Sequence, residues 1–195
     1  MSTDKKIILA SASPRRKDLL SQCGYNFEIM VPNINEEPKE NEQPSEMVLR
    51  LAKEKAIIIA NQQREAIVIA ADTTVAIEID GNIINLGKPE SHEDSKRMLR
   101  LISGKKHSVY TGVSIRSDSL GVEHSFIVKT DVYIALLSDE EIITYVATGE
   151  PSDKAGSYAA QGIGSKFIER IDGSFSNVVG LPLYETTKIL DGLIS

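Results

Sequence analysis

Apolar residues along this chain follow two patterns, and together they predict an α/β fold. Continuous apolar runs at residues 7–10 and 67–71 predict buried strands over residues 6–10 and 67–71, and a second short strand is expected over residues 27–31. Residues 45–60 instead place apolar side chains three or four positions apart, which predicts a long helix capped by Ser45. A shorter helix is expected over residues 14–23, with Cys23 in the core.

The second half of the chain mixes hairpins with helices. Asp80-Gly81 is a hairpin signal between two short strands. Further strands are expected at residues 107–116, 122–136 and 166–171. Helices are expected to begin after Ser91, after the Ser138–Glu141 capping box and at Pro182. We therefore expect an α/β fold with a twisted mixed sheet flanked by helices, in a single domain of residues 1–195 that forms two lobes.

Composition narrows the function classes. The 195 residues carry a formal net charge of −6, which disfavours a nucleic-acid polymer or a membrane surface as partner. The single cysteine excludes an internal disulfide, and three scattered histidines make no zinc site. Because the N-terminal residues lack an apolar leader and no run approaches the ~20 residues of a membrane span, we expect a cytoplasmic protein.

The segment Ser-Ala-Ser-Pro-Arg-Arg at residues 11–16 joins a strand end to a helix start. Ser13 is a good N-cap, Pro14 fits the first helical position, and Arg15 and Arg16 fall in the first turn. Free backbone N–H groups and two guanidinium groups at one helix start favour an anion such as phosphate. The alternative is an ordinary capped helix with two solvated arginines, and the segment alone leaves both open.

Two acidic residues are candidates for catalysis. Asp72 is expected just past the end of the apolar run at 67–71, where it could activate water or hold a divalent metal ion. The alternative is an Asp that bonds the backbone of its own turn. Glu36 lies in an acidic loop and reads as a solvated acid unless it completes a metal site with Asp72.

Three further residues have less specific signals. Lys55 is either a phosphate cation or a lysine that extends from a buried helix face to solvent. Lys88 lies between Gly87 and Pro89, which suits a fixed contact. Gln161 lies in a small-residue segment at 153–164, where its amide could read a base edge, or where small residues permit a close-packed crossing. No P-loop, dinucleotide-binding glycine motif or nucleophile elbow occurs.

Taken in order, these motifs resemble those of the Maf family of nucleoside triphosphate pyrophosphatases, a septum-formation-inhibitor group. The resemblance covers nearly the whole chain. It runs through residues 10–16, 50–56, 71–73, 87–89, 103–104, 107–111, 153–164 and 177–183.

The resemblance implies an ITPase-like fold with a central cleft, and hydrolysis of a nucleoside triphosphate to its monophosphate and pyrophosphate with Mg²⁺ or Mn²⁺. Arg15, Thr73 and Gln161 match the specificity positions of the branch that prefers dTTP and UTP. The branch that prefers N7-methyl-GTP usually has Glu at the position of Gln161.

The resemblance also assigns roles to single residues. Asp72 would be the general base and, with Glu36, a metal ligand, although Glu37 competes with Glu36 for that role. The substrate-binding residues would be Ser11, Ser13, Arg15, Arg16, Lys55, Thr73, Lys88 and Gln161. A homodimer is implied, and the rival function is a nucleotide-sensing protein that inhibits septum formation through a partner.

Overall fold

A computed structural model describes residues 5–195, and within them the chain builds a seven-stranded mixed sheet. The strand order is β2-β1-β3-β5-β6-β7, with β4 paired to β3. β1 lies parallel to β2 and β3, whereas the β3–β4 and β6–β7 pairs are antiparallel. The expected α/β fold with a mixed sheet is therefore confirmed.

The strands are β1 (Ile7–Leu9), β2 (Glu28–Ile29), β3 (Ile67–Ile79), β4 (Asn82–Leu86), β5 (Lys106–Ser117), β6 (Val122–Ile134) and β7 (Ile168–Asp172). The helices are α1 (Pro14–Gln22), α2 (Pro44–Gln62), α3 (His92–Ile102), α4 (Asp139–Ala147), α5 (Phe175–Val179) and α6 (Leu183–Ile194). Three 3₁₀ turns follow α4, namely η1 (Glu150–Asp153), η2 (Ala155–Ser157) and η3 (Ile163–Phe167). No helix within residues 5–195 combines the length and apolar character that a membrane crossing requires.

Three expectations from the sequence need correction, and one helix was missed. β3 continues through Asp72 to Ile79, so Asp72 lies inside a strand and not in a turn after one. The cap of α2 is Gln43, which forms a capping box with Glu46, so Ser45 is already helical. Cys23 follows the last turn of α1 and is exposed, so it is not part of the core. The short helix α5 was not expected.

The fold divides into two compact units. The first consists of residues up to Asp72, residues 111–128 and residues 180–195, and the second consists of residues 73–110 and 129–179. β3, β5 and β6 each contribute residues to both units. Residues 1–4, which belong to the segment judged to lack a leader, lie outside the described residues.

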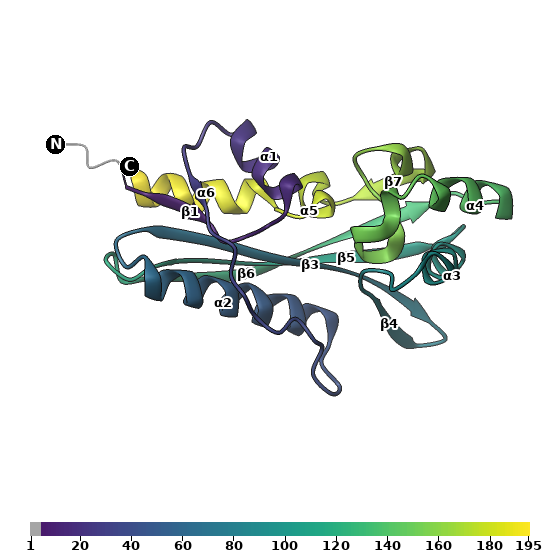
Figure 1. Ribbon diagram of the computed structural model, residues 1–195, viewed down its shortest axis with the longest axis horizontal. Coiled ribbons are helices and arrows are strands. Elements are labelled where there is room, and N and C mark those ends of the chain that lie inside the picture. The colour runs from purple at the N-terminus through teal and green to yellow at the C-terminus, as the bar shows by residue number, and fades with distance from the viewer. Residues whose placement is uncertain (1–4) are drawn as a thin grey trace. The chain divides into compact units, whose positions relative to one another are not determined.

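The core of the first unit lies between α2 and one face of the parallel strands. Side chains alternate along a strand, so Ile8 and Ala10 point to the same face as Val68 and Ala70. These residues are buried against Ala56, Ile59 and Ala60 of α2. Figure 1 shows α2 along this side of the strands and α1 and α6 on the other. Gly112 of β5 permits the close approach, because a Cβ there would lie 2.4 Å from the carbonyl oxygen of Val48 on α2.

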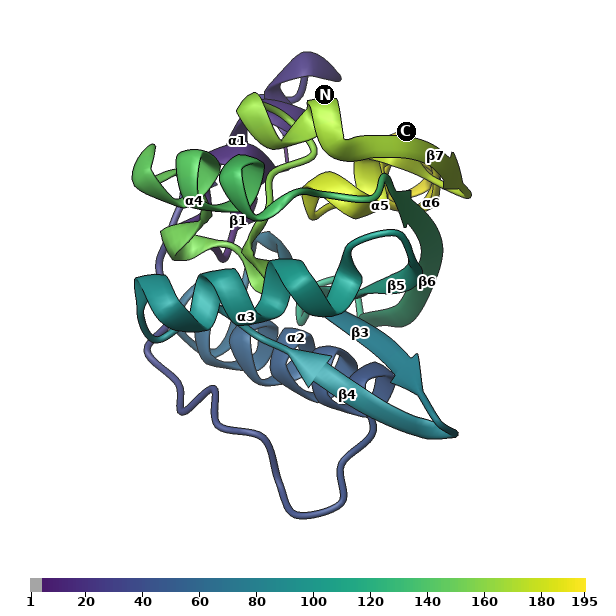
Figure 2. The same ribbon diagram turned by 90° about the vertical axis from the view of Figure 1, so that its right-hand side faces the viewer.

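The core of the second unit joins the β3–β4 hairpin to α3, α4 and the 3₁₀ turns. Val75, Ile77 and Leu86 of the hairpin cluster with Leu99 of α3 and Tyr145 of α4. α3 packs against α4 and against η2, and Figure 2 shows α3 running across the view below α4. The segment at 153–164 is thus built into this core by its 3₁₀ turns.

Candidate active site

Two carboxylates meet one lysine in the first unit. The Lys55 ammonium donates to Glu36 Oε1 at 2.6 Å and to Asp72 Oδ1 at 2.7 Å. Asp72 follows Val68 and Ala70 at every second position of β3, so it shares the face that packs on α2. Lys55 lies beside Ala56 on the buried face of α2. Strand alternation and helix periodicity therefore bring the two residues together.

Two of the three charged side chains in this cluster are largely buried, which costs free energy unless their charges are compensated. The side chain of Lys55 is 8% exposed and that of Asp72 is 13% exposed, whereas Glu36 is about half exposed at 51%. The interpretation of Lys55 as a lysine reaching out to solvent is therefore wrong. A buried ammonium needs compensating negative charge, and the two carboxylates provide it. The result is a partly open charge cluster with one acid facing solvent.

The helix start at residues 11–16 has the expected cap. The Ser13 hydroxyl accepts the Arg16 backbone N–H at 3.4 Å, and Pro14 is the first residue of α1. The Ser11 hydroxyl accepts from the Ser13 backbone N–H at 3.1 Å and from Arg16 Nη1 at 3.3 Å. Both serine hydroxyls therefore accept hydrogen bonds at the start of α1.

Arg16 is held by the protein and is not a solvated side chain. Its Nε donates to the Gly180 carbonyl at 2.7 Å, which is a contact that the sequence analysis missed. Burial lowers the pKa of the Arg16 guanidinium, and the negative charges of Asp72 and Glu36 oppose this effect. Arg15, the preceding residue, adds positive charge beside it. The candidate cations at residues 15, 16 and 55 and the two acids thus share one electrostatic environment in the first unit.

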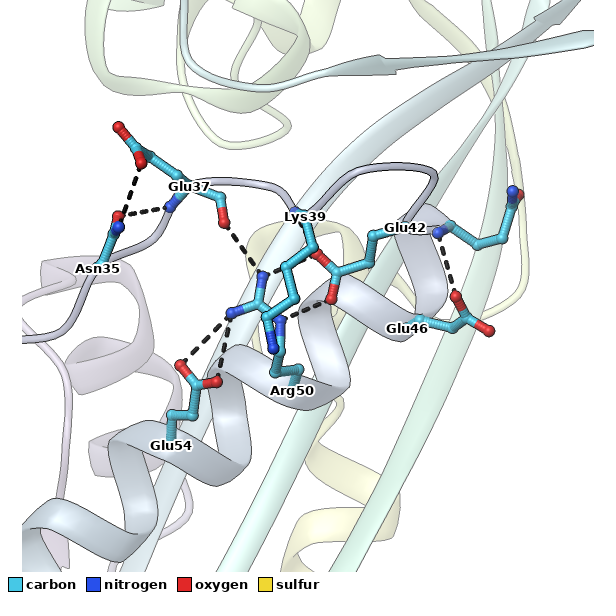
Figure 3. Close-up of polar contacts among 8 residues, drawn as sticks. Asn35, Glu37, Lys39, Glu42, Glu46, Arg50 and Glu54 are labelled. Carbon is cyan, nitrogen blue, oxygen red and sulfur yellow. Dashed lines mark hydrogen bonds and ion pairs between the residues drawn. The ribbon is translucent and has the colours of Figure 1, made fainter.

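The loop that carries Glu36 is fastened to α2 by Arg50, a second residue that the sequence analysis missed (Figure 3). Arg50 donates to both carboxylate oxygens of Glu42 at 2.6 and 2.7 Å, and to the Glu37 carbonyl at 3.2 Å. The hydrogen bonds from Arg50 to the Glu42 carboxylate lower the pKa of Glu42 to about 2. Arg50 and Glu54 are four residues apart on a helix, a spacing that could have suggested part of this network.

The carboxylates of Glu36 and Glu37 have different partners. Glu36 reaches Lys55, whereas the Glu37 carboxylate accepts from the Asn35 side-chain amide at 3.1 Å, as Figure 3 shows. The Glu37 backbone N–H also donates to the Asn35 side chain at 3.0 Å. Of the two adjacent acids, Glu36 is the one that lies with Asp72.

The remaining candidates, Thr73, Lys88 and Gln161, belong to the second unit. Thr73 is partly buried on β3, and Lys88 and Gln161 are exposed. The Gly87 carbonyl, next to Lys88, accepts the Gly156 backbone N–H at 3.1 Å. Gly156 has φ +69° and packs on Val75, where a Cβ would lie 2.9 Å from the valine side chain. The expected close-packed crossing therefore exists at Gly156, and it joins the 153–164 segment to the backbone beside Lys88.

The carboxylates of Glu36 and Asp72 could bind a divalent cation such as Mg²⁺ if substrate phosphate oxygens supply further ligands. No group of three His, Cys, Asp or Glu side chains that could hold a metal ion occurs within residues 5–195. Mg²⁺ typically takes one or two carboxylates, waters and substrate phosphate oxygens. Glu36 and Asp72, which share the Lys55 ammonium, match that donor set once phosphate oxygens are added.

Comparison with known proteins agrees with this arrangement of motifs. The family model described as "Maf-like protein" matches residues 6–193. A dTTP/UTP pyrophosphatase from Vibrio cholerae is 47% identical over 189 residues, which cover 96% of this chain and 98% of the relative. One from Caldicellulosiruptor bescii is 50% identical over 196 residues, which cover 97% of this chain and 95% of the relative.

A comparison with solved structures finds a more distant likeness. The Ham1 protein of Staphylococcus aureus has a TM-score of 0.49 and 14% sequence identity, and the match covers 96% of this chain and 99% of that one.

Proposed function

Because this chain belongs to the Maf-like protein family, we propose that it hydrolyses dTTP and UTP to the nucleoside monophosphate and pyrophosphate. Relatives that are 45–50% identical over nearly their full length carry the name dTTP/UTP pyrophosphatase. The observation that carries the proposal is the Glu36–Lys55–Asp72 cluster, because a protein that only binds nucleotides needs no positioned carboxylate base.

Asp72 is the proposed general base. It accepts a proton from a water molecule whose oxygen attacks the α-phosphorus. The bond between that phosphorus and the oxygen bridging to the β-phosphate breaks, and pyrophosphate leaves with the electron pair. Lys55 holds the Asp72 side chain in place, since its ammonium donates to the carboxylate at 2.7 Å.

The cationic residues and the helix start are the proposed triphosphate contacts. Arg15, Arg16, Lys55 and Lys88 would offset the charge that develops on the phosphate oxygens, and Ser11 and Ser13 form the start of α1. The Gly180 carbonyl and the Ser11 hydroxyl fix the direction of the Arg16 fork before substrate binds.

Base recognition is assigned to Gln161, together with Thr73 and Arg15. The glutamine amide offers one donor group and one acceptor, which matches the adjacent N–H and C=O groups of uracil and thymine. The exposed position of Gln161 leaves its amide available for such a contact.

Glu36 and Asp72 would hold the divalent cation, Mg²⁺ or Mn²⁺. When bound, such a cation neutralises phosphate charge and polarises the phosphorus–oxygen bonds. We also expect the enzyme to act in the cytoplasm, where nucleoside triphosphates are consumed, and to form a homodimer as the family resemblance implies.

The reaction is tested by turnover in water enriched in ¹⁸O. We expect many turnovers of dTTP and UTP with Mg²⁺ or Mn²⁺, with the label in the monophosphate and none in pyrophosphate. Products other than monophosphate and pyrophosphate would overturn the assignment. A one-to-one complex without product would instead support a nucleotide-sensing regulator, and a strong preference for N7-methyl-GTP would place the chain in the other branch.

The role of Asp72 is tested by Asp72→Asn. The amide keeps the size of the side chain but accepts no proton, so we expect kcat to fall at least 100-fold, with nucleotide binding retained by equilibrium titration. Asp118→Asn, which changes an acid that pairs with Arg116, is the matched control and should keep full activity. Near-normal turnover in Asp72→Asn would remove Asp72 from the role of base.

A further inference from the structure

The segment around Gln161 is tied at both ends to one hydrogen-bonded pair, the buried Tyr145 and the partly buried Glu150. The Tyr145 hydroxyl donates to Glu150 Oε2 at 2.7 Å and accepts the Ala159 backbone N–H at 3.1 Å. Glu150 Oε1 accepts the Ile163 backbone N–H, and Oε2 accepts the Gly164 backbone N–H, each at 2.8 Å. The contacts therefore fall two residues before Gln161 and two and three residues after it.

Two glycines show how closely this segment follows the pair. Gly162 has φ +129°, and a Cβ there would lie 2.2 Å from Glu150 Oε1. A Cβ on Gly164 would lie 2.5 Å from the Tyr145 hydroxyl oxygen. A side chain at residue 162 would therefore meet the Glu150 carboxylate, and one at residue 164 would meet the Tyr145 hydroxyl and the Ala159 backbone. The glycines next to Gln161 are thus explained by packing on Glu150 and Tyr145, and Gln161 is the exposed residue between the tied ends.

The pair itself is anchored in the second unit. The Tyr145 side chain is buried and meets the Phe167 ring edge-to-face at 5.1 Å. The Glu150 backbone N–H donates to the Thr148 hydroxyl at 3.2 Å, and the Glu150 carbonyl accepts from Lys154 Nζ at 2.7 Å. Burial alone would raise the pKa of the Glu150 carboxyl. The hydrogen bonds from Tyr145 and the two backbone N–H groups outweigh this effect, so the pKa lies below its usual value. Glu150 therefore remains a carboxylate, the form that can accept all of these donors.

We propose that Glu150 and Tyr145 are positioning residues for base selection, because they fix the backbone on either side of Gln161. This inference rests on the base-reading role proposed for Gln161. A glutamine amide can turn over and exchange its donor and acceptor, so it selects uracil over cytosine only when it is held in one place against the base. A misplacement of about 1 Å can cost an enzyme about 100-fold in rate, and we expect the base contact of Gln161 to be sensitive to displacement as well.

The test compares kcat/KM for dTTP with kcat/KM for dCTP in single and double variants. Glu150→Gln keeps the side-chain size but turns one acceptor into an NH₂ group that faces a backbone N–H. We expect the dTTP/dCTP selectivity of this variant to fall about 10-fold, mainly through KM for dTTP. Tyr145→Phe keeps the ring packing and should act in the same direction, and it replaces Glu150→Gln if that variant does not fold.

The double variant Glu150→Gln/Gln161→Ala separates positioning from a general loss of structure. If Glu150 acts through Gln161, the double variant should have the selectivity of Gln161→Ala alone. Glu141→Gln is the control, because it weakens the capping box of α4 without touching the Gln161 segment, and it should keep wild-type selectivity.

Two results would overturn the inference while leaving the base-reading role of Gln161 intact. One is wild-type selectivity in both Glu150→Gln and Tyr145→Phe when Gln161→Ala loses it. The other is an equal loss from Glu150→Gln with and without Gln161. Wild-type selectivity in Gln161→Ala would overturn the base-reading role itself, and this inference with it.

Discussion

The role of Lys55 could be assigned only from its neighbours in the folded chain. On α2 it interrupts an apolar face, which by itself suggests a side chain reaching past the core. In the folded chain its ammonium is buried between Glu36 and Asp72 at 2.6 and 2.7 Å. The two acids would repel each other without this shared cation, so Lys55 has a structural role in addition to the chemical role proposed for it.

Replacement of Lys55 by methionine should expose that repulsion. Methionine keeps an unbranched apolar stem on α2, but two carboxylates lose their common partner. We expect the free energy of unfolding at pH 7 to fall by about 2–4 kcal/mol, below the full cost of breaking a buried pair because Glu36 is half exposed. Chemical denaturation without divalent cations measures this change.

Two further variants make the Lys55 prediction specific. Adding Glu36→Gln to Lys55→Met should recover part of the lost stability, because one of the two like charges is gone. Lys53→Met, two residues earlier on the same helix, should change stability by much less. Equal losses for Lys53→Met and Lys55→Met would contradict the role of the shared ammonium.

At the scale of elements, the loop between β2 and α2 has its shape set by a helix side chain. Arg50 donates two hydrogen bonds to the Glu42 carboxylate and a third to the Glu37 carbonyl oxygen. The side chains of Arg50 and Glu42 are 16% and 8% exposed, so the pair is well shielded from water. The position of Glu36 therefore depends on a residue that does not contact it.

Arg50→Met should make the loop at residues 35–42 more mobile and should also reduce activity. Loss of the guanidinium leaves the buried Glu42 carboxylate unpaired, and we expect the stability to fall by about 3 kcal/mol and kcat/KM for dTTP by at least 10-fold. Hydrogen exchange over residues 35–42 should rise. In a Glu36→Gln background, Arg50→Met should lower activity no further, because its effect passes through Glu36.

Arg116→Met is the matched control for this loop. Arg116 also pairs with two acids, Asp118 and Glu123, but its side chain is more exposed. Its loss should cost less than about 1 kcal/mol and leave activity unchanged. Full activity in Arg50→Met with faster exchange in the loop would show that the loop position does not matter.

The sequence predicted most elements because their signals are local. Apolar runs, turn glycines and the Ser13, Ser91 and Ser138 caps all depend on residues a few positions apart, and the structure confirms these caps. The continuous β3 was missed because its middle is polar. β1 pairs with β3 as far as Ile69 and β4 pairs from Val75 onward, so the residues between lie where the strand changes partners.

The candidate site was predictable only where its residues have individual signals. Glu36 and Asp72 were considered together as metal ligands and Lys55 separately as a phosphate cation, but no spacing in the sequence showed that the lysine meets both acids. The contact of Arg16 with Gly180 joins residues 164 positions apart, and no local pattern encodes it. Contacts of this kind follow from the path of the chain and become visible only in the folded structure.

At the scale of the whole molecule, each unit contains a group that the fold holds with a strongly lowered pKa. In the second unit, burial lowers the pKa of His107 to about 4, with Asp131 opposing, and its Nε2 lies 2.8 Å from the Tyr158 hydroxyl. In the first unit, Arg50 lowers the pKa of Glu42 from 4.5 to about 2. The two groups therefore titrate in different pH ranges.

For both groups the unfolded chain binds a proton at a higher pH than the folded chain does, so acid lowers the free energy of unfolding. An unfolded histidine titrates near 6.5, so stability from neutral His107 is present above pH 6.5 and is lost as the pH falls to about 4. Stability from ionised Glu42 is present above pH 4.5 and is lost between pH 4.5 and about 2. The loss from His107 is on the order of 3 kcal/mol at completion.

Acid should therefore loosen the second unit before the first. In hydrogen exchange corrected for the intrinsic effect of pH, we expect residues near His107 and Tyr158 to lose protection by about pH 4.5. Residues 35–42 and the first turn of α2 should keep their protection until the pH falls below about 4. His107→Gln, which does not titrate, should remove the first step and leave the second, and Glu42→Gln should do the reverse. Simultaneous loss in both units, unchanged by His107→Gln, would show that protonation of other groups controls acid unfolding.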